Sequence, residues 1–371
     1  MTFKKYIKKG GKKYRLGYTT GTAAAGAAKA AAELLFKDKS PETVSILTPA
    51  GIDVELNVNN YSLRNKTALA SVNKDGGDDK DITDGLEISI KLKEIQQNQI
   101  IIKAGKGVGI VTKPGLAVDV GQPAVNPTPR KMIKNALSSY LKPGQGLEVE
   151  IIVPEGEEAA AKTFNPDLGI EGGISIIGTT GIVEPMSESA YKESLALKLK
   201  QATSTGREQL VFVFGNHGKD RALKMGYEEE GIIRMSNFVG YMLDETSELE
   251  LNKILIIGHV GKIIKIAGGI FNTHSKVADS RREIIAAYAA LDGASQETIG
   301  RVMAANTAEA AADYIIDAGN GKLFNKLADK IRDKIKGRLE QDISIDTMIY
   351  TFENGFIGYS ENLRKDGKNI G

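Results

Sequence analysis

Two short apolar segments that each end in glycine constrain the fold of this chain more than any other feature. LVFVFG covers residues 210–215 and KILIIG covers residues 253–258. Each has the length of a buried strand, and helix-sized segments follow both. Alternation of buried strands and helices is typical of a parallel sheet with helices on both faces. We therefore predict a small doubly wound α/β unit in the C-terminal part of the chain.

The same patterns give a coarse map of both halves. In the C-terminal part, helices are predicted over 238–249, 276–291, 295–318 and 321–339, and a last strand over 346–352. The N-terminal part begins with a basic leader that ends at Arg15, and it has more strands than helices. Its predicted helices cover 22–36 and 129–141, and its predicted strands cover 44–49, 54–58, 67–72, 86–92, 100–111 and 147–154. Strands with irregularly interspersed helices predict an α+β domain with mixed sheets.

A polar stretch, QATSTGREQ at 201–209, separates these two patterns. A chain of 371 residues is also too long for one compact core. We therefore expect an α+β domain over residues 1–200 and an α/β domain over residues 205–371.

Composition excludes several classes of protein. Lys and Arg number 49 against 47 Asp and Glu, so the net charge of +2 argues against a nucleic-acid binder driven by bulk charge. The chain has no cysteine, which excludes disulfides, thiolate catalysis and iron–sulfur clusters. No apolar run approaches the roughly 20 residues of a membrane span. We expect a cytoplasmic protein without nucleic-acid or membrane partners.

Ligands of open α/β sheets bind outside the carboxyl ends of the strands. His217 and His259 directly follow apolar strands, and His274 lies in the loop 268–276. A single histidine is more often a hydrogen-bonded structural residue. All three histidines of this chain, however, fall on predicted rim loops, so we expect at least one to line the site. The other candidates at these strand ends are Gly215, Asn216, Gly218, Ser236, Asn237, Gly258 and Gly261.

Common catalytic motifs do not explain these positions. GxSxG and the P-loop signature are both absent from the sequence. The glycine-rich segment 105–109 precedes Pro114 rather than a helix, so a structural turn is the better interpretation. Only Asp220 lies at a ligand-like spacing from a histidine, so we predict no protein-bound metal.

A threonine turn in the N-terminal half is a candidate anion site. Thr19, Thr20, Gly21 and Thr22 open an alanine-rich helix, where hydroxyls and backbone N–H groups favour carboxylate or phosphate. The alternative, a well-capped structural helix, stays open. Lys113, Arg130 and Lys131 lie beside Gly/Pro loops and are further candidates for pairing with anions, although such side chains are often only solvated.

Long segments of the chain resemble one family. They include GYTTGTAAAGAAKAA, VTKPGLAVDVGQPAVNPTPRKMI, GISIIGTTGIVEPMS, FGNHG, SNFVGYML, GHVGKIIKIAGGIFNTHSKVADSRREI and YTFENGFIGYSE. In this order, from about residue 14 to 361, they resemble the cobalt-precorrin-5B C1-methyltransferases, called CbiD. Many members have Cys directly after TTGT, where this chain has Ala23, so no catalytic thiol is needed there.

The resemblance implies S-adenosylmethionine-dependent methylation of C1 in cobalt-precorrin-5B, giving cobalt-precorrin-6A, within cobalamin biosynthesis. It also implies a second domain with about four parallel strands. The cobalt arrives chelated in the tetrapyrrole substrate. We expect the methyl donor at the rim loops of the second domain, and the substrate carboxylates at Thr19–Thr22, Lys113, Arg130, Lys131 and His274. His259 or His217 either accepts a proton or positions the donor.

Two other classes stay open on the residues alone. A phosphoryl-transfer enzyme would use the threonine turn and the segment 105–109 on nucleotide phosphates, and would bind ATP with Mg²⁺. A non-catalytic tetrapyrrole carrier would bind corrinoids tightly without turning over S-adenosylmethionine. A homo-oligomer also stays open.

Overall fold

The computed structural model describes residues 3–9, 11–166, 168–204, 206–339 and 341–365. The chain forms two compact units, Met1–Glu188 and Ser189–Gly371. Helix α4 (Glu188–Ser204) contributes Leu195, Leu199 and Ala202 to the core of the second unit. The units therefore divide at the first residue of this helix rather than in the polar stretch 201–209, because the helix has a buried apolar face that the sequence pattern did not reveal.

The first unit is built on a mixed sheet. Its strand order is β6-β7-β8-β12-β9, with every neighbouring pair antiparallel except β12 and β9, which are parallel. This arrangement confirms the predicted α+β class with mixed pairing. The strands are β6 (Tyr61–Arg64), β7 (Thr67–Asn73), β8 (Glu87–Ile95), β9 (Ile100–Ala104) and β12 (Gly146–Ile152).

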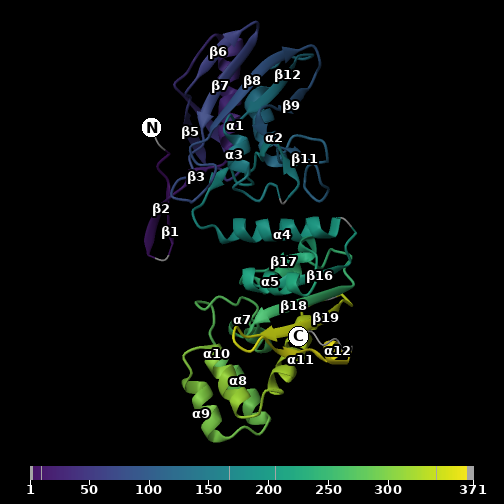
Figure 1. The fold of residues 1–371 in the computed structure, drawn as a ribbon. Helices are drawn as coiled ribbons and strands as arrows, with labels where there is room; N and C mark the ends of the chain where they lie inside the picture. Colours follow the sequence, from purple (N-terminus) through teal and green to yellow (C-terminus); the bar gives the residue numbers. More distant parts are fainter. Residues whose placement is uncertain (1–2, 10, 167, 205, 340, 366–371) are drawn as a thin grey trace. The chain divides into compact units, whose positions relative to one another are not determined.

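Helix α1 (Thr20–Lys37) packs on strands β7 and β8, and α2 (Pro127–Ser138) packs on α1 (Figure 1). The alanine run of α1 is almost wholly buried, since small side chains let the helix approach neighbours on several sides. Gly26 faces the buried Leu56 so closely that a Cβ atom there would overlap its side chain. The helix ends at Lys37, and its C-cap Asp38 has a left-handed φ of 52°.

Short strand pairs complete the first unit. The predicted strand over 100–111 is divided into short strands over 100–104, 107–108 and 110–111, and Gly107, which opens the second of them, has a φ of +74°. The basic leader, for which no structure was predicted, forms the hairpin β1–β2. The pairs are β1 (Tyr6–Lys9) with β2 (Lys12–Arg15), β3 (Gly17–Tyr18) with β15 (Ile182–Val183), β4 (Thr43–Leu47) with β5 (Asp53–Asn57), β10 (Gly107–Val108) with β14 (Gly173–Ile174), and β11 (Ile110–Val111) with β13 (Ile170–Glu171); α3 spans Gly156–Ala160.

The second unit contains a sheet of order β17-β16-β18-β19-β20. Neighbouring strands from β17 to β19 are parallel, and β20 joins β19 antiparallel. The prediction of a last strand over 346–352 missed β20, which returns along β19 after a short turn. The strands are β16 (Gln209–Val213), β17 (Ile232–Arg234), β18 (Lys253–His259), β19 (Ser344–Tyr350) and β20 (Phe356–Tyr359).

Helices cover both faces of this sheet. Leu210 and Phe212 of β16 face one core, whereas Val211 and Val213 face the other, as the alternation of a strand requires. The first core is covered by α4, α6 (Val239–Asp244), α7 (Val260–Ala267), α8 (Arg281–Leu291), α9 (Gln296–Ala304), α10 (Ala308–Asp317) and α11 (Leu323–Lys336). The second core is covered by α5 (Asn216–Lys224) and α12 (Glu361–Lys365). A short 3₁₀ helix, η1, spans Glu229–Gly231.

Several predicted helices are shorter or divided in the structure, and that over 276–291 begins only at Arg281. The pattern over 295–318 divides into α9 and α10, because Ala305 is extended and Thr307 caps α10 by accepting a hydrogen bond from Ala310 N. The predicted helix over 238–249 ends at Asp244. In the described part of the chain, no helix is both long and apolar enough to cross a membrane.

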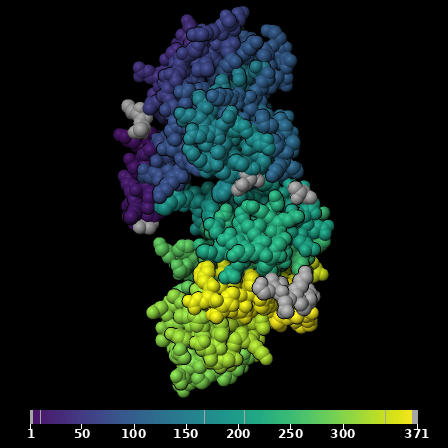
Figure 2. Space-filling view, viewed as in Figure 1, coloured from purple at the N-terminus to yellow at the C-terminus, as the bar shows by residue number. Residues whose placement is uncertain are grey.

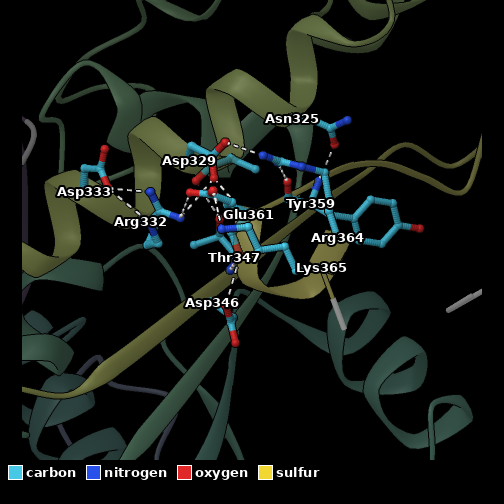
Figure 3. A network of polar contacts seen from close by, with 12 residues as sticks. Asn325, Asp329, Arg332, Asp333, Asp346, Thr347, Tyr359, Glu361, Arg364 and Lys365 are labelled. Atoms are coloured by element: carbon cyan, nitrogen blue, oxygen red, sulfur yellow. Dashed lines mark hydrogen bonds and ion pairs between the residues drawn. The ribbon is translucent and has the colours of Figure 1, made fainter. Parts of the chain in front are cut away.

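A polar network ties the end of the described chain to α11 (Figure 3). The Asp329 carboxylate accepts hydrogen bonds from Glu361 N at 2.7 Å, Arg364 Nη2 at 2.8 Å and Arg332 Nη1 at 3.1 Å. The buried Ser360 hydroxyl accepts from the backbone of β19 and donates to a carboxylate of the same strand. In Figure 2 the closing residues, in yellow, lie between the green atoms around residues 206–250 and the yellow-green helices of residues 280–340.

Candidate functional site

The parallel strands of the second unit bring the predicted rim residues to one edge of the sheet. Strands β16, β17 and β18 end at Val213, Arg234 and His259 in parallel register. Their carboxyl ends are therefore neighbours, which is where ligands of such sheets bind. The residues that follow or end these strands are Gly215, Asn216, His217, Gly218, Ser236, Asn237, Gly258, His259 and Gly261.

His259 is the N-cap of helix α7. Its Nδ1 atom accepts a hydrogen bond from Gly261 N at 3.1 Å, which satisfies one free donor of the first helical turn. Its Nε2 atom lies 3.4 Å from Glu309 Oε2 on α10. An imidazole that accepts at Nδ1 carries its proton at Nε2 when neutral, so this proton lies near the Glu309 carboxylate, although the contact lacks hydrogen-bond geometry.

Burial lowers the pKa of His259 below its ordinary value of 6.5. The Glu309 carboxylate opposes this shift, while the neighbouring Arg221 and His217 reinforce it. Burial therefore favours the neutral form of the imidazole.

Aromatic side chains surround the histidines of this edge. The ring of Phe352, which follows β19, is stacked on His259 with centroids 4.5 Å apart and planes 27° apart. His217 meets the same ring edge-on at 5.0 Å. Tyr350 lies 5.5 Å from His259 and is covered by the guanidinium of Arg221, at 4.3 Å. Phe352 nevertheless keeps 52% of its surface exposed, so the cluster presents a flat apolar face.

Sequence reasoning missed Phe352, Glu309 and Arg221 in this cluster. A signal for Phe352 was present, because it is the last residue of the predicted strand 346–352 and so lies at a strand end, as the two histidines do. Nothing local distinguishes Glu309 or Arg221 from other charged residues on helices.

The glycines of this edge have different roles. Gly258 is buried, and a Cβ atom there would lie 2.6 Å from both Phe214 and Ile263, so close packing requires glycine. Gly215 has open space where a Cβ atom would be, so its backbone is accessible to a ligand.

The polar rim residues have partners within the protein. Asn216 Oδ1 accepts from Arg234 Nη1 at 2.9 Å. Asn237 accepts from Thr273, through both its backbone and side-chain oxygens. These contacts fix the loops that surround the strand ends.

His274 lies in a loop that a buried lysine holds in place. The Lys265 ammonium, only 1% exposed as a residue, donates to Thr273 O at 3.0 Å and to Ala278 O at 2.8 Å. Burial lowers the pKa of Lys265. His274 itself is exposed, and its Nδ1 accepts from Lys276 N within the same turn.

In the first unit, the predicted anion site at the start of α1 is buried and internally bonded. Thr19 Oγ1 accepts from Thr22 N, and Thr22 Oγ1 donates to Gly181 O at 2.7 Å. Thr20 Oγ1 accepts from the backbone N–H of Ile177 at 2.9 Å, and Gly21 N donates to the carbonyl of the same residue. The three hydroxyls thus serve the junction with the second threonine turn, 178–181.

Two of the predicted basic residues meet at an open hollow of about 490 Å³. Arg130 Nε and Nη2 donate to Val125 O and Pro123 O, at 2.7 and 3.0 Å, so this side chain also holds the preceding loop. Burial lowers the pKa of Arg130. The lining residues are Ala117, Val118, Asp119, Gln122, Pro127, Arg130, Lys131, Lys134 and Asn135.

Lys113 does not line this hollow. Its aliphatic stem packs against Gly169, where a Cβ atom would lie 2.5 Å from Lys113 Cγ. Within the described residues, no three or more His, Asp or Glu side chains gather as a metal site would require.

Comparison with known proteins places these features in a family. Residues 7–185 match the CbiD family model, and residues 272–361 match the model of the CbiD C-terminal domain. A cobalt-precorrin-5B C(1)-methyltransferase from Alkaliphilus metalliredigens (strain QYMF) is 48% identical over 356 residues, covering 96% of this chain and 94% of the relative. A relative of the same name from Thermoanaerobacter sp. (strain X514) is 49% identical over 314 residues, covering 85% and 86%.

A third relative of that name, from Photorhabdus laumondii subsp. laumondii, is 43% identical over 357 residues, covering 95% of this chain and 94% of the relative. A 1.9 Å crystal structure of the cobalamin biosynthesis protein cbiD from Archaeoglobus fulgidus shares 28% identity, with a TM-score of 0.40, over 74% of this chain and 87% of that chain. The family models and the extent of sequence identity show that this chain belongs to the CbiD family.

Proposed function

We propose that this protein methylates C1 of cobalt-precorrin-5B with S-adenosylmethionine, giving cobalt-precorrin-6A and S-adenosylhomocysteine. The observation that carries the proposal is 48% identity along almost the whole chain to a relative named for this activity. The cobalt belongs to the substrate, so the protein needs no metal ligands of its own for this reaction.

The methyl donor is proposed to bind at the carboxyl edge of the parallel sheet in the second unit. The exposed Phe352 ring, backed by His259, suits the flat adenine of the donor, because aromatic rings stack favourably. Gly215 offers accessible backbone beside it. Once bound there, S-adenosylmethionine supplies an activated methyl group on a sulfonium.

The substrate carboxylates are proposed to bind at the hollow of the first unit. A precorrin carries several acetate and propionate groups, which require cationic partners when they lose water. Arg130, Lys131 and Lys134 supply positive charge around the hollow, against the single carboxylate of Asp119. The buried threonines of α1 are proposed to set the position of the helix rather than to contact the substrate.

His259 is proposed to position the donor rather than to take up a proton. The lone pair of Nδ1 already accepts from Gly261 N, and Nε2 faces a carboxylate. Positioning alone gives large rate enhancements when a reactive leaving group is already present.

Mass spectrometry tests the activity directly. The protein is incubated with cobalt-precorrin-5B and S-adenosylmethionine carrying a deuterated methyl group, and one labelled methyl should enter the macrocycle. Tight corrinoid binding without transfer would instead indicate a carrier, and Mg²⁺-dependent ATP binding would indicate phosphoryl transfer. Hydrogen exchange with S-adenosylhomocysteine then tests the donor site, through protection of residues 215–218, 258–262 and 350–354.

A further inference from the structure

We propose that Glu309 is a positioning residue that fixes the His259 imidazole and the Phe352 ring in one arrangement, and so shapes the flat wall of the donor site. The location of the donor at this wall rests on the proposed function. The contacts of Glu309 itself do not depend on it.

The two oxygens of Glu309 have different partners. Oε1 accepts a hydrogen bond from Phe352 N at 2.6 Å, and Oε2 lies 3.4 Å from His259 Nε2. The Nε2 atom is buried and forms no hydrogen bond in the described part of the chain, so its 3.4 Å approach to Glu309 is a longer electrostatic contact. One carboxylate on α10 therefore joins the end of β18 to the turn after β19.

The protons of this arrangement can be counted. Gly261 N–H and Phe352 N–H are both donors, and each needs an acceptor. The Nδ1 atom of His259 accepts from Gly261, so the single proton of the neutral imidazole is on Nε2 and also needs an acceptor. An ionised Glu309 carboxylate supplies an acceptor to each side, with Oε1 bonded to Phe352 N and Oε2 at 3.4 Å from His259 Nε2.

A glutamine at this position has one acceptor oxygen and one donor group. If its oxygen accepts from Phe352 N, its NH₂ group faces His259 Nε2–H, and two donors meet. The imidazole must then move its proton to Nδ1 and lose the bond from Gly261, or rotate away. If the amide turns over, Phe352 N loses its acceptor and the stacked ring is no longer held. The isosteric Glu309→Gln substitution therefore disrupts the wall without changing its volume.

Asp313 offers a matched control. It lies one helical turn after Glu309 on α10, and its Oδ1 atom accepts from Asn354 Nδ2 at 2.8 Å, in the same turn as Phe352. Asp313→Asn removes the same charge and keeps an oxygen acceptor for this bond. It makes no contact with His259 in the structure, so it controls for the loss of one negative charge on α10.

The experiment compares the wild-type protein, Glu309→Gln, Asp313→Asn and Phe352→Ala. The ¹⁵N resonances of the histidine rings are recorded, with His259 assigned by substitution, and the affinity for S-adenosylhomocysteine is measured by calorimetry. We expect the wild-type and Asp313→Asn proteins to show His259 protonated at Nε2 and free at Nδ1. Glu309→Gln should lose this pattern and bind S-adenosylhomocysteine about tenfold more weakly or worse, because the flat wall is no longer held in one arrangement.

Phe352→Ala should weaken binding to a similar extent and keep the His259 pattern, because Glu309 still accepts from the backbone N–H of residue 352. An unchanged His259 pattern in Glu309→Gln overturns the inference. So does a changed pattern with wild-type affinity, because the residue would then order the loop without shaping the site. If the wild-type protein fails to bind S-adenosylhomocysteine, the donor placement fails, and the role of Glu309 in fixing His259 is decided by the ring resonances alone.

Discussion

At the residue scale, His259 combines a backbone cap, an aromatic stack and a carboxylate contact in one side chain. His259→Asn separates them, since asparagine is a good N-cap but has no ring. We expect weaker binding of S-adenosylhomocysteine, an unchanged pH dependence of turnover, and little loss of stability. Calorimetry measures the affinity, a pH–rate profile measures the pH dependence, and thermal unfolding measures the stability. A 10²–10⁴-fold fall in kcat with unchanged affinity would instead identify a general base.

The hollow of the first unit gives a second prediction about single residues. Arg130→Ala should raise KM for the precorrin and also lower the thermal midpoint, because Arg130 holds Val125 O and Pro123 O as well as lining the hollow. Lys131→Ala should raise KM alone, since Lys131 is exposed. Each lost charge-assisted bond should contribute about 1.5–3 kcal/mol. Lys113→Ala is the control, and an equal rise of KM in that variant would contradict the assignment.

At the element scale, the start of α1 is held by hydroxyls that the protein itself uses. Thr22→Val keeps the shape of the side chain but removes the bond to Gly181 O. We expect a loss of about 0.5–1.5 kcal/mol in unfolding free energy and no change in KM. Urea unfolding and steady-state kinetics test this prediction. A large rise of KM at unchanged stability would contradict this prediction and would support the threonine turn as a substrate-binding site.

Asp329 is one of the residues that join helix α11 to the end of the described chain, which gives a second prediction at this scale (Figure 3). Asp329→Ala should destabilise the protein by about 1–3 kcal/mol, because Glu361 N and Arg364 both lose their acceptor. Asp333→Ala, whose side chain is 58% exposed, should change stability by less than about 0.5 kcal/mol. Equal effects in the two variants would mean that the network has no special role.

At the scale of the whole molecule, the two units should respond differently to acid. Burial lowers the pKa of His259 below 6.5 in the folded state, so its contribution to stability is complete above pH 6.5 and is lost as pH falls through the lowered pKa. Burial acts to raise the pKa of Asp75 and Asp81. The opposing effects, led by those of Arg15 on Asp75 and of Lys74 on Asp81, are together larger, so both pKa values lie below 3.8. Their contribution remains until the pH falls below about 3.8.

We therefore expect the second unit to lose protection first as pH is lowered from 7 to 4. Hydrogen exchange should show faster opening around residues 258–262 than around residues 74–85. His259→Asn should remove this pH dependence. Earlier opening of the segment 74–85 would contradict the prediction.

The sequence by itself determined the features that depend on neighbours along the chain. Apolar strands ending in glycine predicted the parallel sheet, and the alanine run after a threonine turn predicted α1, because periodicity and capping act over a few residues. The same logic placed His217 and His259 at one sheet edge. It failed for β20 and for the division of 295–318, where short local signals were weak.

Only the tertiary structure decided which distant side chains meet. Glu309 contacts the backbone of Phe352, 43 residues further along the chain, and Thr22 contacts Gly181, 159 residues away. Such pairs leave no periodic signal, because packing and the pairing of buried polar groups select them after the elements have formed. For this reason the sequence did not predict that the threonine turn 19–22 is buried against residues 177–181. Nor did it predict that His259 lies beside the Glu309 carboxylate.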